Sequence, residues 1–272
     1  MSQNRIHGLF GTSKGTLYYK KKGYPVGRKS HKERPPEEVS VVKKICGDRP
    51  TYGVPRVRRI AERDYGEKMS YHRVYSIMEE EGLLLSKTLG RQSRREHTGK
   101  ISVEEPNTRW ASDITSIKLW DGLKARFTYV LDCCDRSIIA WRLGLRMQAV
   151  DIEQMIEEAI LTRFSKDQIR APGLEFLHDN GPEYVEKVFR KRLLEWDVVD
   201  CHTPSYSPES NGICEAFNGT FKRDYVYQGY LDNIEVLRKQ IEKWVADYNT
   251  FAPHSALGMK TPAEFFKLMQ AA

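Results

Sequence analysis

Residues 108–119 read Thr-Arg-Trp-Ala-Ser-Asp-Ile-Thr-Ser-Ile-Lys-Leu, a run of apolar, β-branched and hydroxyl-bearing residues that is typical of a β-strand. Two runs of similar character follow at short intervals, over residues 127–134 and 137–143. Strands that follow one another through short connections usually pair as neighbours. The stretch therefore predicts an antiparallel meander of three strands.

Beyond the meander, helical patterns alternate with short apolar runs. Apolar residues recur every three to four positions in four segments, which predicts helices over residues 149–164, 182–196, 214–226 and 232–248. Two short apolar runs are predicted as strands, over residues 174–178 and 198–201. A turn-rich loop, residues 204–212, precedes the third helix. This order predicts an α/β fold in which helices flank both faces of a mixed five-stranded sheet.

Positive charge is concentrated at the start of the chain. Residues 1–100 carry 23 Lys+Arg against 11 Asp+Glu, whereas residues 101–272 carry 21 against 26. A basic segment joined to a mildly acidic remainder favours a nucleic-acid-binding arm attached to a separate working domain. A solvated basic surface without such a partner is the alternative at this point.

Three short helices are predicted within the basic segment, over residues 36–46, over residues 54–64, and after a cap at Ser70. Their apolar faces consist of Val42, Ile45 and Cys46, of Val57, Ile60 and Ala61, and of Val74, Ile77 and Met78. Polar faces of the second and third helices carry the candidate DNA-binding residues Arg56, Arg59, Arg63 and Arg73. Short helices joined by a glycine-bearing turn, with arginines outside, are typical of a helix-turn-helix. Helix pairs of this size also occur in proteins that bind no DNA.

The overall composition argues against several other classes of protein. The 272 residues are 40% hydrophobic and 30% charged, which is typical of a globular chain. No apolar run reaches the roughly 18 residues that a membrane helix needs. The N-terminus shows no apolar signal segment, so a cytoplasmic protein is expected. The five cysteines include no CxxC pair, which argues for free thiols and against a structural zinc site.

Three carboxylates stand where chemistry is expected. Asp113 interrupts the first strand, and a charge there is costly unless it is paired or bound to a metal. Asp179 follows the fourth strand and precedes Asn180-Gly181, at a strand end of the kind where α/β sheets bind ligands. Glu215 lies in the first turns of the third helix of the core, with 35 residues between it and Asp179.

Carboxylates that meet at one point suit divalent ions. Mg²⁺ prefers oxygen ligands, and two such ions roughly 3.5–4 Å apart can activate an attacking oxygen and stabilise a leaving one. Lys222 lies two helical turns after Glu215, on the same helix face, and could hold a DNA phosphate. From the residues alone, two alternatives stay open. The three carboxylates are ordinary surface charges, or the site uses other acidic residues, namely Asp132, Asp135, Asp197 and Asp200.

Five motifs follow one another in a fixed order along most of the chain: Tyr-Gly-Val-Pro-Arg-Val-Arg-Arg-Ile at 52–60, Trp-Ala-Ser-Asp-Ile-Thr at 110–115, Asp-Asn-Gly-Pro-Glu-Tyr at 179–184, the segment 207–225 around Glu215 and Lys222, and the segment 248–262 with Pro253-His254. Together they resemble the second-frame (OrfB-type) transposases of the two-frame bacterial insertion-sequence family. Each motif alone is weak, but their order and the 35-residue spacing make the resemblance specific.

The resemblance implies a ribonuclease-H-like core of the retroviral-integrase kind and a DNA transposase, which is a polynucleotidyl transferase. It implies that Asp113, Asp179 and Glu215 are catalytic and bind two Mg²⁺ ions, for which Mn²⁺ would substitute. Lys222 and Asn211 would contact DNA. The implied substrates are the terminal inverted repeats of a mobile element and target DNA. The implied partners are further copies of the chain on DNA and an upstream-frame protein or fusion. The implied location is the bacterial cytoplasm, in association with the nucleoid.

With this resemblance, five segments are predicted. They are a basic N-terminal arm (1–35), a helix-turn-helix DNA-binding domain (36–84), a basic linker (85–104), an integrase-like catalytic core (105–230) and a C-terminal helical segment (231–272).

Two positions depart from the family pattern. His178 stands where Ser or Thr is common, and it is either a packing variant or part of the metal surroundings. Packing is favoured, because Mg²⁺ seldom takes imidazole. Ala252 stands where many members carry a basic residue. Two rival functions are a ribonuclease-H-type nuclease and a DNA-binding regulator without catalysis; the basic arm disfavours the first, and the intact carboxylate set disfavours the second.

Overall fold

The computed structural model describes residues 34–86, 103–164, 169–179, 181–184, 186–202 and 212–271. Most of the predicted basic arm and basic linker, and most of the turn-rich loop, lie outside the described residues. The chain divides into two compact units, residues 1–40 and 41–272, and the second contains nearly all of the described structure.

Three short helices form the described start of the chain: α3 (Pro36–Asp48), α4 (Val54–Tyr65) and α5 (Tyr71–Glu80). The predicted inner faces of all three are confirmed, since each of the nine residues named above is buried. Gly66 ends α4 with a left-handed φ of 73°, a conformation that favours glycine. The Ser70 hydroxyl caps α5 by accepting a hydrogen bond from the Arg73 main-chain nitrogen at 3.2 Å.

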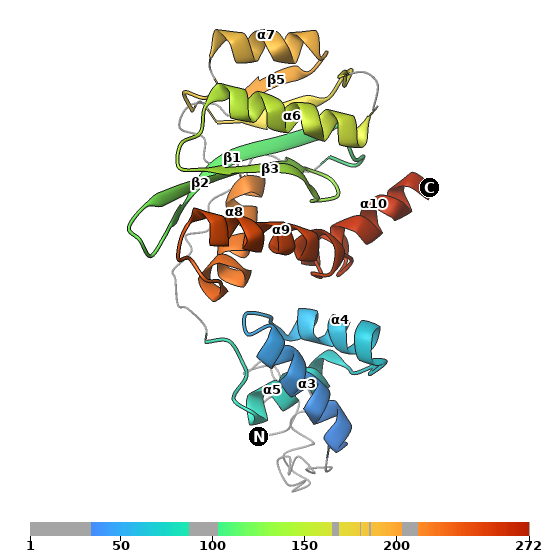
Figure 1. The fold of residues 1–272 in the computed structure, drawn as a ribbon. Coiled ribbons are helices and arrows are strands. Elements are labelled where there is room, and N and C mark those ends of the chain that lie inside the picture. Colours follow the sequence, from blue (N-terminus) through green and yellow to red (C-terminus); the bar gives the residue numbers. More distant parts are fainter. Residues whose placement is uncertain are drawn as a thin grey trace, which may run out of the picture. The chain divides into compact units, whose positions relative to one another are not determined.

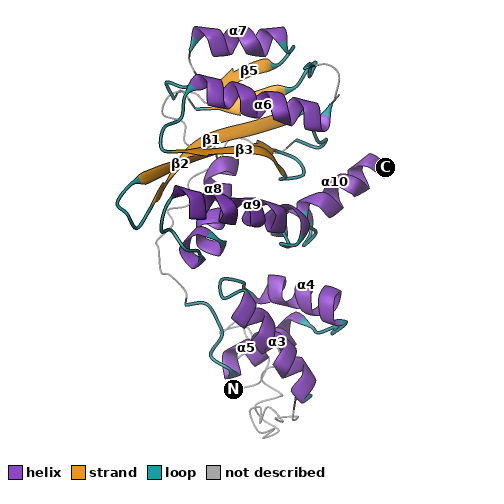
Figure 2. Cartoon of the chain, viewed as in Figure 1, coloured by secondary structure: helices purple, strands orange, loops and turns teal. Residues whose placement is uncertain are grey.

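A five-stranded mixed sheet forms the centre of the second unit (Figure 2). Its strands are β1 (Arg109–Lys118), β2 (Lys124–Asp132), β3 (Ile138–Gly144), β4 (Glu175–His178) and β5 (Val199–His202), in the spatial order β3-β2-β1-β4-β5. The first three pair antiparallel, which confirms the predicted meander. Strand β4 runs parallel to β1, and β5 runs parallel to β4.

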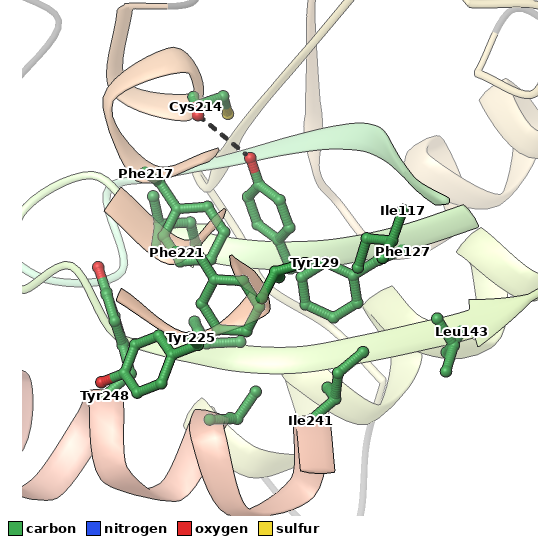
Figure 3. Packing of buried hydrophobic residues seen from close by; sticks show 14 of the residues in the cluster. Ile117, Phe127, Tyr129, Leu143, Cys214, Phe217, Phe221, Tyr225, Ile241 and Tyr248 are labelled. Atoms are coloured by element: carbon green, nitrogen blue, oxygen red, sulfur yellow. Dashed lines mark hydrogen bonds between the residues drawn. The ribbon is translucent and has the colours of Figure 1, made fainter. Parts of the chain in front are cut away.

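Helices cover both faces of this sheet, as predicted (Figure 1). On one face lie α6 (Ala149–Arg163) and α7 (Lys187–Glu195), and on the other lie α8 (Gly212–Asp224) and α9 (Ile234–Thr250). Figure 3 shows the apolar core on the α8 side, where the Phe127 and Phe221 rings stack with centroids 5.2 Å apart. Because aromatic side chains bury a large apolar area, this packing stabilises the position of α8 on β1 and β2.

Two boundaries differ from the sequence prediction by three residues or more. Strand β2 begins at Lys124 rather than at residue 127, because Lys118 of β1 pairs with it and extends the hairpin. Helix α7 begins at Lys187 rather than near residue 182. Residues 181–184 form a turn instead, closed by a hydrogen bond from the Tyr184 nitrogen to the Gly181 carbonyl. The ring of Tyr184, the last residue of this turn, is completely buried.

A 3₁₀ turn, Val226–Gln228, follows α8. The C-terminal segment contains α9, a second 3₁₀ turn, Ser255–Leu257, and α10 (Pro262–Ala271), for which no separate helix was predicted. None of the helices in the described parts of the chain is long and apolar enough to cross a membrane. All five cysteines are free thiols.

His254 gives the C-terminal segment a pH-dependent stability. The ring is buried against Tyr248, with ring centroids 4.5 Å apart. Burial, together with the charge of Arg56, lowers the pKa of His254 from 6.5 to about 4. As the pH falls from 6.5 towards 4, the unfolded chain takes up a proton that the folded chain does not, so the folded state loses stability.

We therefore expect the Tm of the wild-type protein to fall more steeply between pH 6.5 and pH 4 than the Tm of His254→Asn. Thermal melts of the two proteins across this interval measure the difference. Parallel pH profiles would contradict the assignment of this component to His254.

Candidate active site

Asp113 lies in the middle of β1 on the face that α8 covers. Its neighbours at two-residue spacing, Ala111 and Ile117 among them, belong to the core on that face. Tyr129 stands directly opposite Asp113 on β2. Burial is the main cause that raises the pKa of Asp113, and the negative charge of Asp179 raises it further. A hydrogen bond from Asn218 and the charge of Lys222 act in the opposite direction.

The parallel pairing of β4 with β1 brings Asp179 towards Asp113. Ala111 is paired with Leu177, so each aspartate lies two residues further along its own chain segment. The Asp179 carboxylate accepts a hydrogen bond from the Gly181 nitrogen at 3.0 Å. A Cβ added at Gly181 would lie only 3.0 Å from that same carboxylate oxygen, so glycine leaves the room that this tight turn needs.

Glu215 lies in the first turn of α8, and Asn218 ties this helix to Asp113. The Asn218 amide donates to the Asp113 carboxylate at 2.6 Å and accepts from the Tyr129 hydroxyl at 3.2 Å. Glu215 precedes Asn218 by three residues, which is about 4.5 Å along the helix on nearly the same face. Its side chain is exposed and has no ion-pair partner among the described residues. Asn218 was not predicted from the sequence, although its spacing from Glu215 was a usable signal.

The three predicted carboxylates do not form a closed cluster. Within the described parts of the chain, no three His, Cys, Asp or Glu side chains gather closely enough to hold a metal ion. Asp113 and Asp179 influence each other electrostatically, and Glu215 stands on the helix that is tied to Asp113.

The four rival acidic residues have structural partners. Asp132 accepts hydrogen bonds from four groups, the main-chain nitrogens of Asn107, Cys134 and Asp135 and the indole of Trp110. Asp135 pairs with Arg163 at 3.0 Å, and Asp197 lies 3.5 Å from Arg170. Asp200 pairs with His178 at 2.8 Å. These partners account for the four carboxylates without an ion.

His178 does not face the carboxylates. Its ring stacks on Tyr184, with centroids 4.7 Å apart and planes 13° from parallel, and Tyr184 belongs to the core on the α6 and α7 side. Residues alternate between the faces of a strand, so His178 points away from the face where Asp113 lies. The His178 ring is therefore not placed to ligate a metal ion together with Asp113.

The predicted DNA-binding residues are in several different environments. Arg56 pairs with Asp224 at 2.5 Å and lies over the Tyr52 ring. Arg63 donates to the Phe251 carbonyl at 2.9 Å and pairs with Asp64 at 2.6 Å. Contact between DNA phosphates and these two guanidinium groups would compete with those bonds.

The other predicted DNA contacts lie in different surroundings. Arg59 is half-buried, and its buried Nε has no hydrogen-bond partner within the described structure. Arg73 lies half-buried on α5, and Lys222 lies half-buried on α8, where its charge reaches Asp113. Asn211 lies outside the described residues. A role in DNA binding stays a prediction for all of them.

Known protein families match the helical start of the chain and its sheet-containing part separately. Residues 103–208 and residues 200–262 each match a family described as integrase core domain, and residues 35–92 match a family described as HTH-like domain. The chain is 34% identical over 249 residues to transposase InsD for insertion element IS2A/D/F/H/I/K of Escherichia coli, and the alignment covers 89% of this chain and 82% of the relative. The chain belongs to the transposases of bacterial insertion elements.

Other comparisons agree with this membership. The transposase is also 34% identical to transposase InsD for insertion element IS2-9 of Escherichia coli strain K12, over 89% of this chain and 80% of that relative. Its fold resembles a chain in the simian T-cell lymphotropic virus intasome in complex with PP2A regulatory subunit B56 gamma. That likeness has a TM-score of 0.52 at 17% identity, and it covers 83% of this chain and 74% of the other. The predicted OrfB-type family and ribonuclease-H-like fold are confirmed. The transposase thus carries a polynucleotidyl transferase core, and DNA is its partner.

Proposed function

We propose that this transposase cuts and joins the ends of its own insertion element by in-line phosphoryl transfer, with Asp113, Asp179 and Glu215 as its metal-binding carboxylates. One observation carries the proposal. The parallel pairing of β1 with β4 brings the charge of Asp179 within reach of Asp113, and Asn218 ties the helix of Glu215 to Asp113.

The chemistry of these residues fits a divalent cation. All three supply carboxylate oxygens, the ligands that Mg²⁺ prefers. Burial and the Asp179 charge both raise the pKa of Asp113, which means that they destabilise its ionised carboxylate. A nearby cation would offset this destabilisation. Two Mg²⁺ ions, or Mn²⁺ in their place, would supply charge neutralisation at the reacting phosphate and activation of the attacking oxygen.

The protein itself supplies position and charge. Asn218 holds Asp113 in one orientation and fixes α8 over the sheet, and Tyr129 in turn holds Asn218. Lys222, whose charge already reaches Asp113, would bind the phosphate of a DNA strand entering beside the carboxylates. Positioning and charge neutralisation are the main requirements of phosphoryl transfer, so no covalent protein intermediate is needed.

The remaining parts of the proposal concern DNA and partners. The relatives are transposases for named insertion elements, which supports terminal inverted repeats and target DNA as the substrates. The helix-turn-helix region, residues 36–84, would bind DNA beside the core, residues 105–230. The same proposal includes the assembly of further copies of the chain on DNA, an upstream-frame partner, and a location at the bacterial nucleoid.

The test is a strand-transfer assay on DNA that bears the element's own ends. We expect the wild-type transposase to produce joined strands with Mg²⁺ and to lose this activity when Mg²⁺ is chelated. Glu215→Gln should reduce joining by at least about 10²–10³-fold, the loss expected when one group that stabilises transition-state charge is removed. DNA binding, measured by gel shift, should persist.

Glu235→Gln is the matched control, because Glu235 is also exposed in the first turn of a helix, α9, yet lies outside the proposed site. Full joining by Glu215→Gln would overturn its role. Cleavage without joining by the wild-type protein would point to a nuclease, and DNA binding without cleavage by the wild-type protein would point to a regulator.

A further inference from the structure

We infer that His178, held by Asp200, positions the Asp179 turn and thereby the metal-binding carboxylates. The inference rests on the proposed function, because it gives Asp179 the role of a metal ligand. It concerns a buried imidazole next to that ligand, on the opposite face of the sheet.

Both ring nitrogens of His178 have defined partners. Nδ1 lies 2.5 Å from the main-chain oxygen of Asp179, and a carbonyl oxygen can only accept, so Nδ1 donates this hydrogen bond. Nε2 lies 2.8 Å from a carboxylate oxygen of Asp200. The other Asp200 oxygen lies 3.7 Å from Nε of Arg190 on α7. The ring thus connects the end of β4 to the neighbouring strand β5 and, through Asp200, to α7.

Packing removes the remaining freedom of the imidazole. The side chain of His178 is fully buried, stacked on Tyr184, with the Phe189 ring edge-on at 6.0 Å. Tyr184 is fixed in turn, because its hydroxyl lies 2.7 Å from the Ser112 hydroxyl on β1. A ring held on all sides can hold the carbonyl of Asp179 in one direction.

The consequence falls on the Asp179 carboxylate. Asp179 is held at two points, by His178 at its carbonyl and by the Gly181 nitrogen at its side chain. Together these bonds set the direction in which the carboxylate leaves the strand end. Partners that orient a metal ligand in this way typically change metal affinity or activity by about 10–100-fold when they are removed.

The experiment measures Mn²⁺ binding to the full chain by electron paramagnetic resonance titration, alongside strand transfer and Tm. His178→Phe keeps a ring against Tyr184 but removes both nitrogens, and we expect it to raise the Mn²⁺ dissociation constant by about tenfold or more. His178→Asn keeps a donor near the position of Nδ1, so it should restore most of the affinity. Asp200→Asn should weaken binding less than His178→Phe, because the ring still reaches the Asp179 carbonyl.

Ile160→Val is the matched control. Ile160 lies on α6, fully buried in the same core as Tyr184 and Phe189, and the smaller side chain removes apolar packing without changing a hydrogen-bonding group. It should lower Tm with Mn²⁺ affinity unchanged. If His178→Phe behaves in the same way, His178 only packs, and the inference is wrong.

Asp179→Asn separates this inference from the proposed function. Loss of Mn²⁺ affinity in Asp179→Asn, with wild-type affinity in His178→Phe, would overturn the inference alone. Wild-type affinity in Asp179→Asn, or a wild-type chain that binds no Mn²⁺, would overturn the proposed metal site and the inference with it.

Discussion

Asp113→Asn is expected to abolish strand transfer and, at neutral pH, to raise the Tm of the transposase. The amide keeps the shape of the carboxylate and can still accept the hydrogen bond from Asn218. It cannot supply the charge that the proposed metal site needs, so joining should fall by at least about 10²–10³-fold. The rise in Tm follows from the pKa of Asp113, which burial and Asp179 raise above its ordinary value.

A raised pKa of an acid means that ionisation is less favourable in the folded chain than in the unfolded chain. Below the ordinary pKa of 3.8, Asp113 is protonated in both the folded and the unfolded chain, so its ionisation does not change the free energy of unfolding. As the pH rises from 3.8 to the raised pKa of the folded chain, the unfolded state ionises before the folded state does, and the folded state loses stability. The amide of the variant cannot ionise, so the Tm difference between variant and wild type should grow from acid to neutral pH.

Thermal melts without metal, at acid and neutral pH, measure this difference. Asp121→Asn is the control, since Asp121 is exposed in the β1–β2 turn, where it accepts a hydrogen bond from the Leu123 nitrogen. It should leave joining intact. A variant at position 113 that still joins strands would remove Asp113 from the site, and an unchanged Tm difference across pH would contradict the electrostatic account.

Arg163→Met is expected to cost the folded state about 3–5 kcal/mol, because it leaves a buried carboxylate without its partner. Asp135 is fully buried, and the Arg163 guanidinium pairs with both of its oxygens, at 3.0 and 3.4 Å. The side chain of Arg163 is 8% exposed and lies 3.9 Å from the centre of the Phe266 ring. Its loss therefore affects the turn after β2, the end of α6 and the packing of α10.

Calorimetric melts of the purified variant would show this as a fall in Tm of about 10 °C. Glu158→Gln is the control on the same helix. It breaks the ion pair of Glu158 with Arg142, in which Glu158 is 55% exposed, and exposed pairs contribute only about 0–1 kcal/mol. Equal losses in the two variants would contradict a burial-dependent effect.

Local patterns in the sequence were enough for most of the secondary structure. Helical spacing predicted the buried faces of α3, α4 and α5, and β-branched runs predicted the meander of β1, β2 and β3. These signals are reliable because neighbouring residues alone determine which face of a helix or strand is apolar. The start of α7 was predicted wrongly. Residues 181–184 form a turn, and the burial of Tyr184 in the core depends on residues far away in the sequence.

The sequence by itself determined the order of elements, the family, and three carboxylates as the proposed site, the last two through motifs whose order and spacing are specific. Only the tertiary structure decided that β4 pairs with β1 and so brings Asp179 towards Asp113, that Asn218 reaches Asp113, and that Arg56 is paired with Asp224. It also decided which face His178 occupies. The physical reason is that such contacts join residues far apart in the chain, and their choice depends on how all of the elements pack together, which no local pattern records.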